Sequence, residues 1–387
     1  MNILMINYEY PPLGGGGGVF NKQLAEELAG KNSVTVITSR FDAQKSFEVV
    51  NDVEIIRVPV FLRGDQNAAT IVSMLSFFPF SLWAGKKLLE NKRFDIIHSM
   101  FAIPSAPSGL ALARKYHIPH VLSILGGDIY DPSKKLSPHK TPILHRTVKK
   151  MIEGSDSVIA LSSDIKGRAL KHYNPSTKID IIHLGIPRPS FIKLSRSHFN
   201  FDDKDFLLVT VGRLVRRKGL QDLIKALRNL NKSNIKLVII GDGPERTTLG
   251  EVASSLNVSK QVFFLGRVSD EEKFQLLSAS DIYVSSSQHE GFGIVFLEAM
   301  ATGLPVVCYD KGGQTDFLID KKTGFLVNYE DIHLLSKRIK ELCDNHMLRE
   351  RISKFNTQYI EKFFISHCAE RYQSVYDSLA ADKTSKN

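Results

Sequence analysis

Residues 289–300 read HEGFGIVFLEAM, and they place two carboxylates, Glu290 and Glu298, on either side of a Gly-Phe-Gly turn. The apolar run from Ile294 predicts the start of a helix, with Glu290 in the preceding loop and Glu298 about one turn inside. The two glycines of the turn let the backbone approach a ligand closely. Because a carboxylate accepts hydrogen bonds from two neighbouring hydroxyls, the segment suits a ligand rich in hydroxyl groups.

Strands with glycine-bearing ends are predicted on both sides of this segment. Their ranges are residues 207–211, 237–240, 282–285 and 305–309. An amphipathic helix is predicted from Leu220 to Leu230, directly after Arg216, Arg217, Lys218 and Gly219. Strands that alternate with helices predict a doubly wound parallel sheet, which binds its ligand beyond the carboxyl ends of the strands. Basic residues at such a strand end indicate an anionic ligand.

The N-terminal half repeats the pattern. A strand is predicted over Ile3–Asn7, a loop over Gly14–Gly18, a helix over Val19–Leu28 and a strand over Ser33–Ile37. Glycines at this point leave room for a ligand and allow the amides of the helix to face an anion. The spacing is not that of a dinucleotide fingerprint, because Thr35–Thr38 supplies no acid at the end of the second strand. A nicotinamide-dependent enzyme is therefore disfavoured.

Several motifs follow one another in a specific order along the chain. They are Gly212-Arg213 with Lys218-Gly219, Gly241-Asp242-Gly243-Pro244, the segment from Glu290 to Glu298, Gly303-Leu304-Pro305-Val306-Val307, and Gly312-Gly313 with Thr323-Gly324-Phe325-Leu326-Val327. This order resembles the retaining glycosyltransferases of family 4 (glycosyl transferases group 1), which have the GT-B fold. The resemblance spans most of the chain and implies an α/β protein with two Rossmann-like, doubly wound parallel-sheet domains facing an interdomain cleft.

The resemblance also implies a division of the chain. Residues 1–190 would form an N-terminal acceptor-binding domain, and residues 191–365 a C-terminal domain that binds the nucleotide sugar. Residues 366–387 would form a helix that crosses back to the first domain, with a frayed tail from Ala380. The length of 387 residues, with 43% hydrophobic and 24% charged residues, suits two domains that each bury a core.

The implied reaction moves a sugar from a UDP- or GDP-sugar to a glycan or lipid-linked glycan acceptor, with retention of the anomeric configuration. Arg213 and Lys218 would stabilise the departing diphosphate, Glu290 would hold the transferred sugar, and Glu298 would hold the ribose. The predicted catalytic residues are Glu290, Arg213 and Lys218, and the predicted donor-binding residues are Gly15, Gly16, Gly212, Arg213, Lys218, Gly241, Gly291, Phe292, Gly293, Ile294 and Glu298.

We expect no metal site. We also expect no cofactor, because the nucleotide sugar is a substrate. The acidic run Asp202-Asp203-Lys204-Asp205 lies in the predicted linker, Pro187–Asp205, where a solvated turn is the simpler interpretation. Fixed positive charge would therefore replace the divalent metal that other transferases use.

On the acceptor side, His98 and Asp128 are candidates because each stands at or just after the end of a predicted strand. Leu125 occupies a position where many members of the resembled family have a histidine, so no histidine acid or base is predicted there. A strand-end histidine is more often structural than functional.

Charge is unevenly distributed. Residues 1–195 carry 24 Lys and Arg against 16 Asp and Glu, and they include a basic amphipathic stretch, Lys134–Met151, and an apolar stretch, Ile71–Ala84. Such a stretch can lie on an anionic membrane surface, although an ordinary solvated helix face is an equal alternative. The start of the chain, Met1–Asn7, lacks a signal pattern, which predicts a cytoplasmic protein. The basic and apolar stretches would place it on the inner face of the cell membrane. Nothing predicts nucleic-acid binding.

Two other classes of function remain open. A nucleotide-sugar epimerase on the same fold would process the donor without an acceptor, and a phosphorylase would need a pyridoxal lysine that no motif marks. A catalytically silent nucleotide-sugar-binding subunit is conceivable because of Leu125. The sequence does not identify the sugar, the nucleotide, the acceptor or the oligomeric state.

Overall fold

The computed structural model describes residues 1–64, 69–131 and 136–384. Contacts between residues divide the chain into two units. Unit 1 combines Met1–Pro187 with Phe364–Asn387, and unit 2 is Arg188–Phe363. Each unit is built around its own doubly wound sheet, which confirms the predicted fold class.

Unit 1 contains an eight-stranded sheet with the order β3-β4-β2-β1-β5-β6-β7-β8. Its strands are β1 (Asn2–Asn7), β2 (Ser33–Ser39), β3 (Phe47–Val50), β4 (Val53–Val58), β5 (Ile96–Met100), β6 (His120–Ile124), β7 (Ser157–Ala160) and β8 (Ile179–Ile181). All neighbours are parallel except β3, which pairs antiparallel with β4 at the edge. The strand order reverses between β1 and β5.

Helices cover both faces of this sheet. They are α1 (Gly16–Ala29), α2 (Ile71–Asn91), α3 (Ala106–Tyr116), α4 (Pro142–Gly154), α5 (Ser163–Tyr173) and α12 (Ile365–Thr384). The first of them begins at Gly16, three residues before the predicted start, because three glycines of the predicted loop form its first turn. Similarly, α12 continues beyond Ala380, where the sequence predicted a frayed tail.

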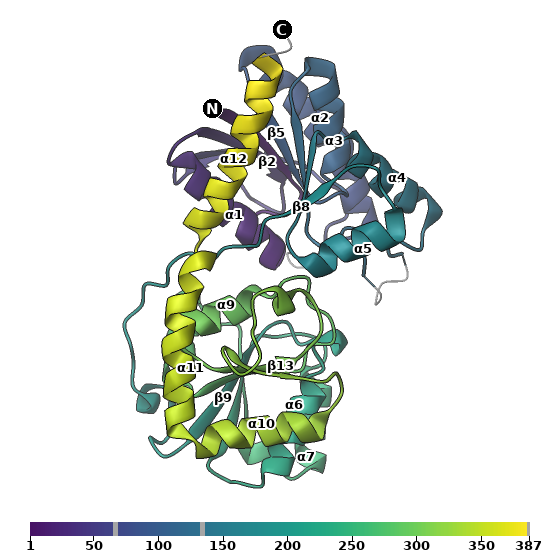
Figure 1. Cartoon of the computed structure of the whole chain (residues 1–387). Helices are drawn as coiled ribbons and strands as arrows, with labels where there is room; N and C mark the ends of the chain where they lie inside the picture. Colours follow the sequence, from purple (N-terminus) through teal and green to yellow (C-terminus); the bar gives the residue numbers. More distant parts are fainter. Residues whose placement is uncertain (65–68, 132–135, 385–387) are drawn as a thin grey trace. The chain divides into compact units, whose positions relative to one another are not determined.

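The last helix of the chain completes the core of unit 1. It packs beside α1 (Figure 1), and its Tyr376 hydroxyl bonds Nδ1 of His98 at 2.7 Å. The other ring nitrogen of His98, Nε2, lies 2.9 Å from Ser123 Oγ, which in turn lies 2.9 Å from the Tyr372 hydroxyl. His98 is therefore fully buried and both of its nitrogens are used within the core.

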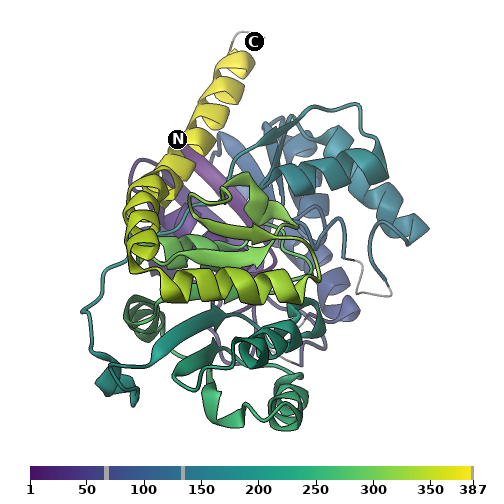
Figure 2. The same cartoon turned by 60° about the horizontal axis from the view of Figure 1, so that its bottom comes forward.

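Unit 2 contains a six-stranded, wholly parallel sheet with the order β11-β10-β9-β12-β13-β14. Its strands are β9 (Phe206–Val211), β10 (Ile235–Ile240), β11 (Val262–Gly266), β12 (Ile282–Ser285), β13 (Val306–Tyr309) and β14 (Gly324–Val327). Its α-helices are α6 (Leu220–Leu230), α7 (Arg246–Ser255), α8 (Asp270–Ala279), α9 (Ile294–Ala301), α10 (Ile332–Asp344) and α11 (His346–Tyr359). Figure 2 shows α10 across one face of the sheet, where it shares a core with α6 and α7.

The helix predicted from Leu348 to Leu379 is two helices in the structure. A 3-10 turn, Ile360–Phe363, separates α11 from α12, and the two helices belong to different units. The break has a packing cause, since Ile360 and Phe364 are both buried and Phe364 forms a β-bridge with Ile186 of unit 1. The sequence pattern that predicts a helix continues through residues 360–363, so the sequence alone predicts one helix instead of two.

The buried histidines predict an acid-sensitive unit 1. Burial, and then the nearby His120, lower the pKa of His98 to about 3. Between about pH 6.5 and pH 3 the unfolded chain binds a proton that the folded chain rejects, so stability is complete above this window and falls as the pH falls. The slope is about 1.4 kcal/mol per pH unit for each such histidine.

Urea unfolding at pH 7 and pH 5 measures this effect. We expect His98→Gln to be less stable than the wild type at pH 7 but to lose less stability on going to pH 5. The control is His346→Gln, at an exposed position of α11. Equal pH dependence of the wild type and His98→Gln would contradict the assignment.

Candidate active site

The candidate site of unit 2 lies where its strand order reverses. β9 and β12 are neighbours in the sheet, but the chain leaves them toward opposite sides, to β10 and to β13. In a doubly wound sheet this divergence opens a crevice at the carboxyl ends of the two strands. The residues that follow the strands are 212–219 after β9 and 286–293 after β12, and these two segments contain most of the predicted donor-binding residues.

Hydrogen bonds join the two segments. Ser286 Oγ donates to the carbonyl of Gly219 at 2.8 Å, and the amide of Gln288 donates to the carbonyl of Arg217 at 2.8 Å. Gly219 has a φ of +60°, and a Cβ on it would lie 2.5 Å from the carbonyl oxygen of Ser286. Any other residue there would separate the segments, so glycine is required for their close approach.

Lys218 and Glu290 form a buried ion pair across these segments. Their side chains are 14% and 9% exposed. Burial raises the pKa of Glu290, but Lys218, with smaller contributions from Arg217 and Ser287, lowers it by more in total, so the pKa lies below its ordinary value and the carboxylate stays charged. The backbone of Glu290 is fixed as well, because its carbonyl accepts a hydrogen bond from the Gly313 amide at 2.9 Å.

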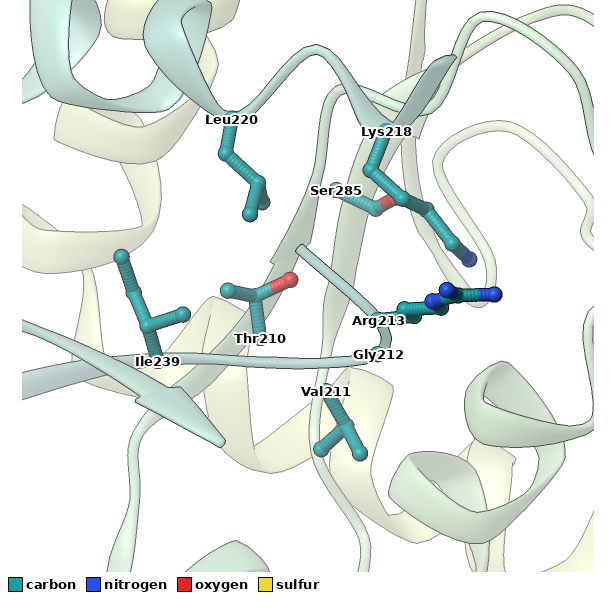
Figure 3. Close-up of a pocket in the computed structure, with 8 residues that line it drawn as sticks. All are labelled: Thr210, Val211, Gly212, Arg213, Lys218, Leu220, Ile239 and Ser285. Carbon is teal, nitrogen blue, oxygen red and sulfur yellow. The ribbon is translucent and has the colours of Figure 1, made fainter. Parts of the chain in front are cut away.

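Arg213 supplies a second cation beside Lys218. The two side chains extend to the same side of the turn after β9 (Figure 3). Arg213 is exposed, and within residues 1–64, 69–131 and 136–384 no acid pairs with its guanidinium. The small pocket beneath them has a volume of about 10 Å³, roughly the room for one water. A larger anion would therefore bind above this pocket, against the two cationic groups.

Glu298 is the fifth residue of α9 and is buried. Its Oε1 atom accepts a hydrogen bond from Lys273 Nζ at 2.8 Å, whereas its Oε2 atom is buried with no partner among the described residues. Burial raises the pKa of Glu298, and Lys273 offsets that rise only in part. An unpartnered buried carboxylate oxygen is costly unless a ligand donates to it. Glu298 is thus prepared to accept a hydrogen bond from a ligand.

The sequence did not reveal the role of Lys273. It lies in α8 and also bonds Asp270 Oδ1 at 2.9 Å, so it stands between two acids. In sequence it follows a run of acids that is typical of a solvated helix start. Only the folded arrangement of α8 beside α9 brings it to Glu298.

The other predicted donor-binding residues have different positions. The Gly241 amide, at the end of β10, donates to the Gly266 carbonyl at 2.7 Å and so is already satisfied. The Phe292 ring is buried against Phe317, with ring centroids 4.9 Å apart. Ile294 is the first residue of α9, as predicted. The remaining members of the predicted set around this crevice are Gly212, Gly291 and Gly293, which belong to the two segments described above.

In unit 1, Gly15 precedes α1 and Gly16 is its first residue. Both are exposed, and a Cβ on Gly15 would meet nothing within 4 Å. Gly17 is closer to its neighbours, since a Cβ on it would lie 2.9 Å from the Phe101 ring and 3.1 Å from Leu125. The N-terminal turn of α1 therefore lies beside Leu125, where many members of the resembled family have a histidine.

Both acceptor-side candidates are buried, and their side chains make hydrogen bonds that have a structural role. His98 is enclosed in the core between β6 and α12, so it does not reach a binding surface. Asp128 is buried, and its carboxylate accepts hydrogen bonds from the amides of Ala102, Leu125 and Gly126 at 2.7, 3.0 and 2.8 Å. Asp128 thus fastens the loops after β5 and β6.

Comparisons with known proteins agree with this arrangement. A family model described as "Glycosyltransferase Family 4" matches residues 14–188, and one described as "Glycosyl transferases group 1" matches residues 191–359. The chain is 29% identical to an uncharacterized glycosyltransferase of Methanocaldococcus jannaschii, over 97% of this chain and 98% of the relative. It is 26% identical to N-acetyl-alpha-D-glucosaminyl L-malate synthase of Bacillus anthracis, over 97% of each chain.

Solved structures show the same fold. The sucrose-phosphate synthase of Thermosynechococcus elongatus superposes with a TM-score of 0.86 at 22% identity, covering 99% of this chain and all of that one. HepE of Anabaena, solved in complex with UDP-glucose, gives a TM-score of 0.78 at 18% identity, covering 98% of this chain and all of that one. With matched family models over both halves and a doubly wound sheet in each unit, the chain is a glycosyltransferase of the GT-B fold.

Proposed function

We propose that this glycosyltransferase moves a sugar from a nucleoside diphosphate sugar to a glycan or lipid-linked glycan acceptor, with retention of configuration and without a metal ion. The observation that carries the proposal is the cluster at the ends of β9 and β12, where Lys218 pairs with the buried carboxylate of Glu290 and Arg213 extends to the same side as Lys218. Cations placed there suit a diphosphate, and a buried carboxylate suits sugar hydroxyls.

The leaving diphosphate gains negative charge as its bond to the anomeric carbon breaks. The guanidinium of Arg213, which has no ion-pair partner in the described part of the chain, would stabilise that charge in the transition state. Lys218 keeps two further N–H donors while it is paired with Glu290, so it can contact the phosphate as well. A departing phosphate oxygen would take the proton of the acceptor hydroxyl as the new glycosidic bond forms on the same face.

The two carboxylates would hold different parts of the donor. Glu298, with its unpartnered oxygen, suits the ribose hydroxyls, and Glu290 suits the hydroxyls of the transferred sugar. Both UDP and GDP remain candidates, since HepE of Anabaena was solved with UDP-glucose and a 24% identical relative in Mycolicibacterium smegmatis is a GDP-mannose-dependent mannosyltransferase.

A panel of UDP- and GDP-sugars, each with and without glycan and lipid-linked acceptors, tests the proposal. We expect acceptor-dependent release of nucleoside diphosphate, unchanged by EDTA, and a product whose anomeric proton coupling matches that of the donor. Conversion of the donor to another nucleotide sugar without an acceptor would indicate an epimerase. Binding without any turnover would indicate a silent binding subunit.

Arg213→Ala should lower kcat about 100-fold, because it removes a charge contact that strengthens as the diphosphate departs. Steady-state kinetics with the best donor measure the change. Arg216→Ala, which removes an exposed arginine from the adjacent 3-10 turn, is the matched control and should retain near-normal turnover. If the two variants behave alike, the assignment of Arg213 to the diphosphate is wrong.

Glu298→Gln should weaken the binding of free nucleoside diphosphate, while Glu290→Gln should mainly lower turnover of the sugar donor. The reason is that only the nucleotide part of the ligand would contact Glu298. Titration calorimetry with UDP and GDP separates the two effects. An equal loss of nucleotide affinity in both variants would show that the two carboxylates do not divide the donor in this way.

Lys273→Met should make nucleotide binding depend on pH. Burial already raises the pKa of Glu298, and loss of the lysine removes the charge that offsets this rise, so the carboxyl binds a proton more readily. Affinity should then fall as the pH is lowered, with a much smaller change in the wild type. The double variant Lys273→Met/Glu298→Gln has no such carboxyl and should lose the pH dependence. A pH-independent single variant would contradict this coupling.

A further inference from the structure

The helix α2 of unit 1 is apolar on both of its sides. Its inner side is buried, through residues such as Phe77 and Ala84. Its outer side carries Leu75, 66% exposed, Phe78, 40% exposed, and Trp83, 63% exposed. A helix that is apolar all round normally has both sides covered. No helix in the described residues is both long and apolar enough to cross a membrane, so α2 is not a spanning segment.

The apolar surface extends beyond the helix. Phe61 and Leu62, in the segment before α2, are both exposed, and the Phe61 ring packs edge-on against Phe80 with centroids 5.4 Å apart. Between α2 and the β3–β4 edge lies a groove of about 910 Å³, which is a size typical of sites for small amphiphilic ligands. Its apolar lining includes Phe47, Val58, Pro79, Phe80, Trp83 and Leu88.

Cations surround this surface. The charged residues that line the groove are Arg40, Arg57, Lys87 and Lys92, and none of the lining residues is an acid. Arg57 is paired with Glu48 and Lys92 with Glu54, at 2.8 and 2.9 Å. Arg40 and Lys87 form no ion pair among the described residues, and Lys87 Nζ lies 5.6 Å from the Trp83 ring. The free charge at the rim is therefore positive.

A second basic element lies on the same face of the sheet. α2, α3 and α4 follow β4, β5 and β6 in right-handed crossovers, and each helix packs on the next. The stretch Lys134–Met151 was predicted to be basic and amphipathic. Its Val148 and Met151 are buried in the core, whereas Leu136 and Ile143 are 54% and 75% exposed. Arg146 and Lys150 are exposed as well, while Lys134 and Lys135 lie outside the described residues.

We infer that the outer face of α2 docks on an anionic lipid bilayer, with its aromatic and aliphatic side chains at the acyl boundary and the basic residues of its rim and of α4 at the phosphates. The inference rests on the proposed lipid-linked acceptor, because that acceptor would be presented from such a surface. Tryptophan next to lysine at the edge of an apolar patch is typical of proteins that lie in a membrane interface.

A second copy of the chain fits this surface less well. In a symmetric dimer the same patch meets itself, so the basic rim of one copy would face the basic rim of the other. Glu48 and Glu54 neutralise Arg57 and Lys92, but no acid among the described residues lines the groove to offset the charge of Arg40 and Lys87. Anionic phospholipid supplies both the apolar contact and the opposite charge.

Trp83 makes the test direct, since it is the one tryptophan of the 387 residues. Vesicles of phosphatidylcholine with phosphatidylglycerol should shift its fluorescence to the blue, and brominated acyl chains should quench it. Vesicles of phosphatidylcholine alone should give a much weaker effect, and high salt should reverse the binding. Unchanged Trp83 fluorescence with anionic vesicles at low salt would overturn the inference.

Leu75→Glu should weaken vesicle binding at least about tenfold in flotation assays, since it replaces an inserting leucine with an anion. The matched control is Met347→Glu, at an 80% exposed position of α11 in unit 2, which should bind vesicles as the wild type does. Equal effects of the two substitutions would overturn the inference. A concentration-dependent dimer of the wild type, detected by light scattering and absent in Leu75→Glu, would also overturn it.

Nucleotide binding distinguishes this inference from the proposed function. Leu75→Glu should bind UDP or GDP as tightly as the wild type, because α2 belongs to unit 1 and the candidate donor site to unit 2. Vesicle binding without any turnover would leave the docking surface intact and refute the proposed reaction. Turnover without vesicle binding would support the proposed reaction and refute the docking surface.

Discussion

The reversal of strand order between β9 and β12 is the constraint on which the candidate site depends. The chain leaves these two neighbours in opposite directions, and because crossovers between parallel strands are right-handed, the two connections go to opposite faces of the sheet. Neither connection therefore fills the crevice between the departing segments. Ser286 and Gly219 then set how closely the segments approach. The architecture thus fixes the place of the site, and a few side chains and one glycine fix its width.

The charged groups of this crevice are of two kinds, buried carboxylates that are paired with lysines and an exposed guanidinium. Glu290 and Glu298 are buried, and a buried carboxylate costs several kcal/mol unless a cation and hydrogen bonds compensate it, so each has its own lysine. Arg213 is exposed and remains without a paired acid in the described residues. The carboxylates are therefore held in position before any ligand arrives, and the guanidinium keeps its charge for the ligand.

Local patterns were sufficient to predict the strands β9, β10, β12 and β13, the helix α6 and the start of α9, because each has a clear apolar run or amphipathic pattern, and β9 and β10 are followed directly by glycine. They did not predict the β3–β4 hairpin, because its edge strand β3 has no buried residue and so lacks a continuous apolar run. They also missed the pairing of Lys273 with Glu298 and the enclosure of His98 by Tyr376. These contacts join segments that are distant in the sequence, and no periodicity encodes a partner of that kind.

The membership of α12 in unit 1 has a consequence for synthesis on the ribosome. The strands of unit 1 emerge first, yet the helix that packs on α1 and bonds His98 is translated last, after all of unit 2. At about 5–20 residues per second, the nascent first sheet waits on the order of ten seconds or more with that face uncovered. Unit 2, which is continuous in sequence, can reach its native structure before unit 1 does.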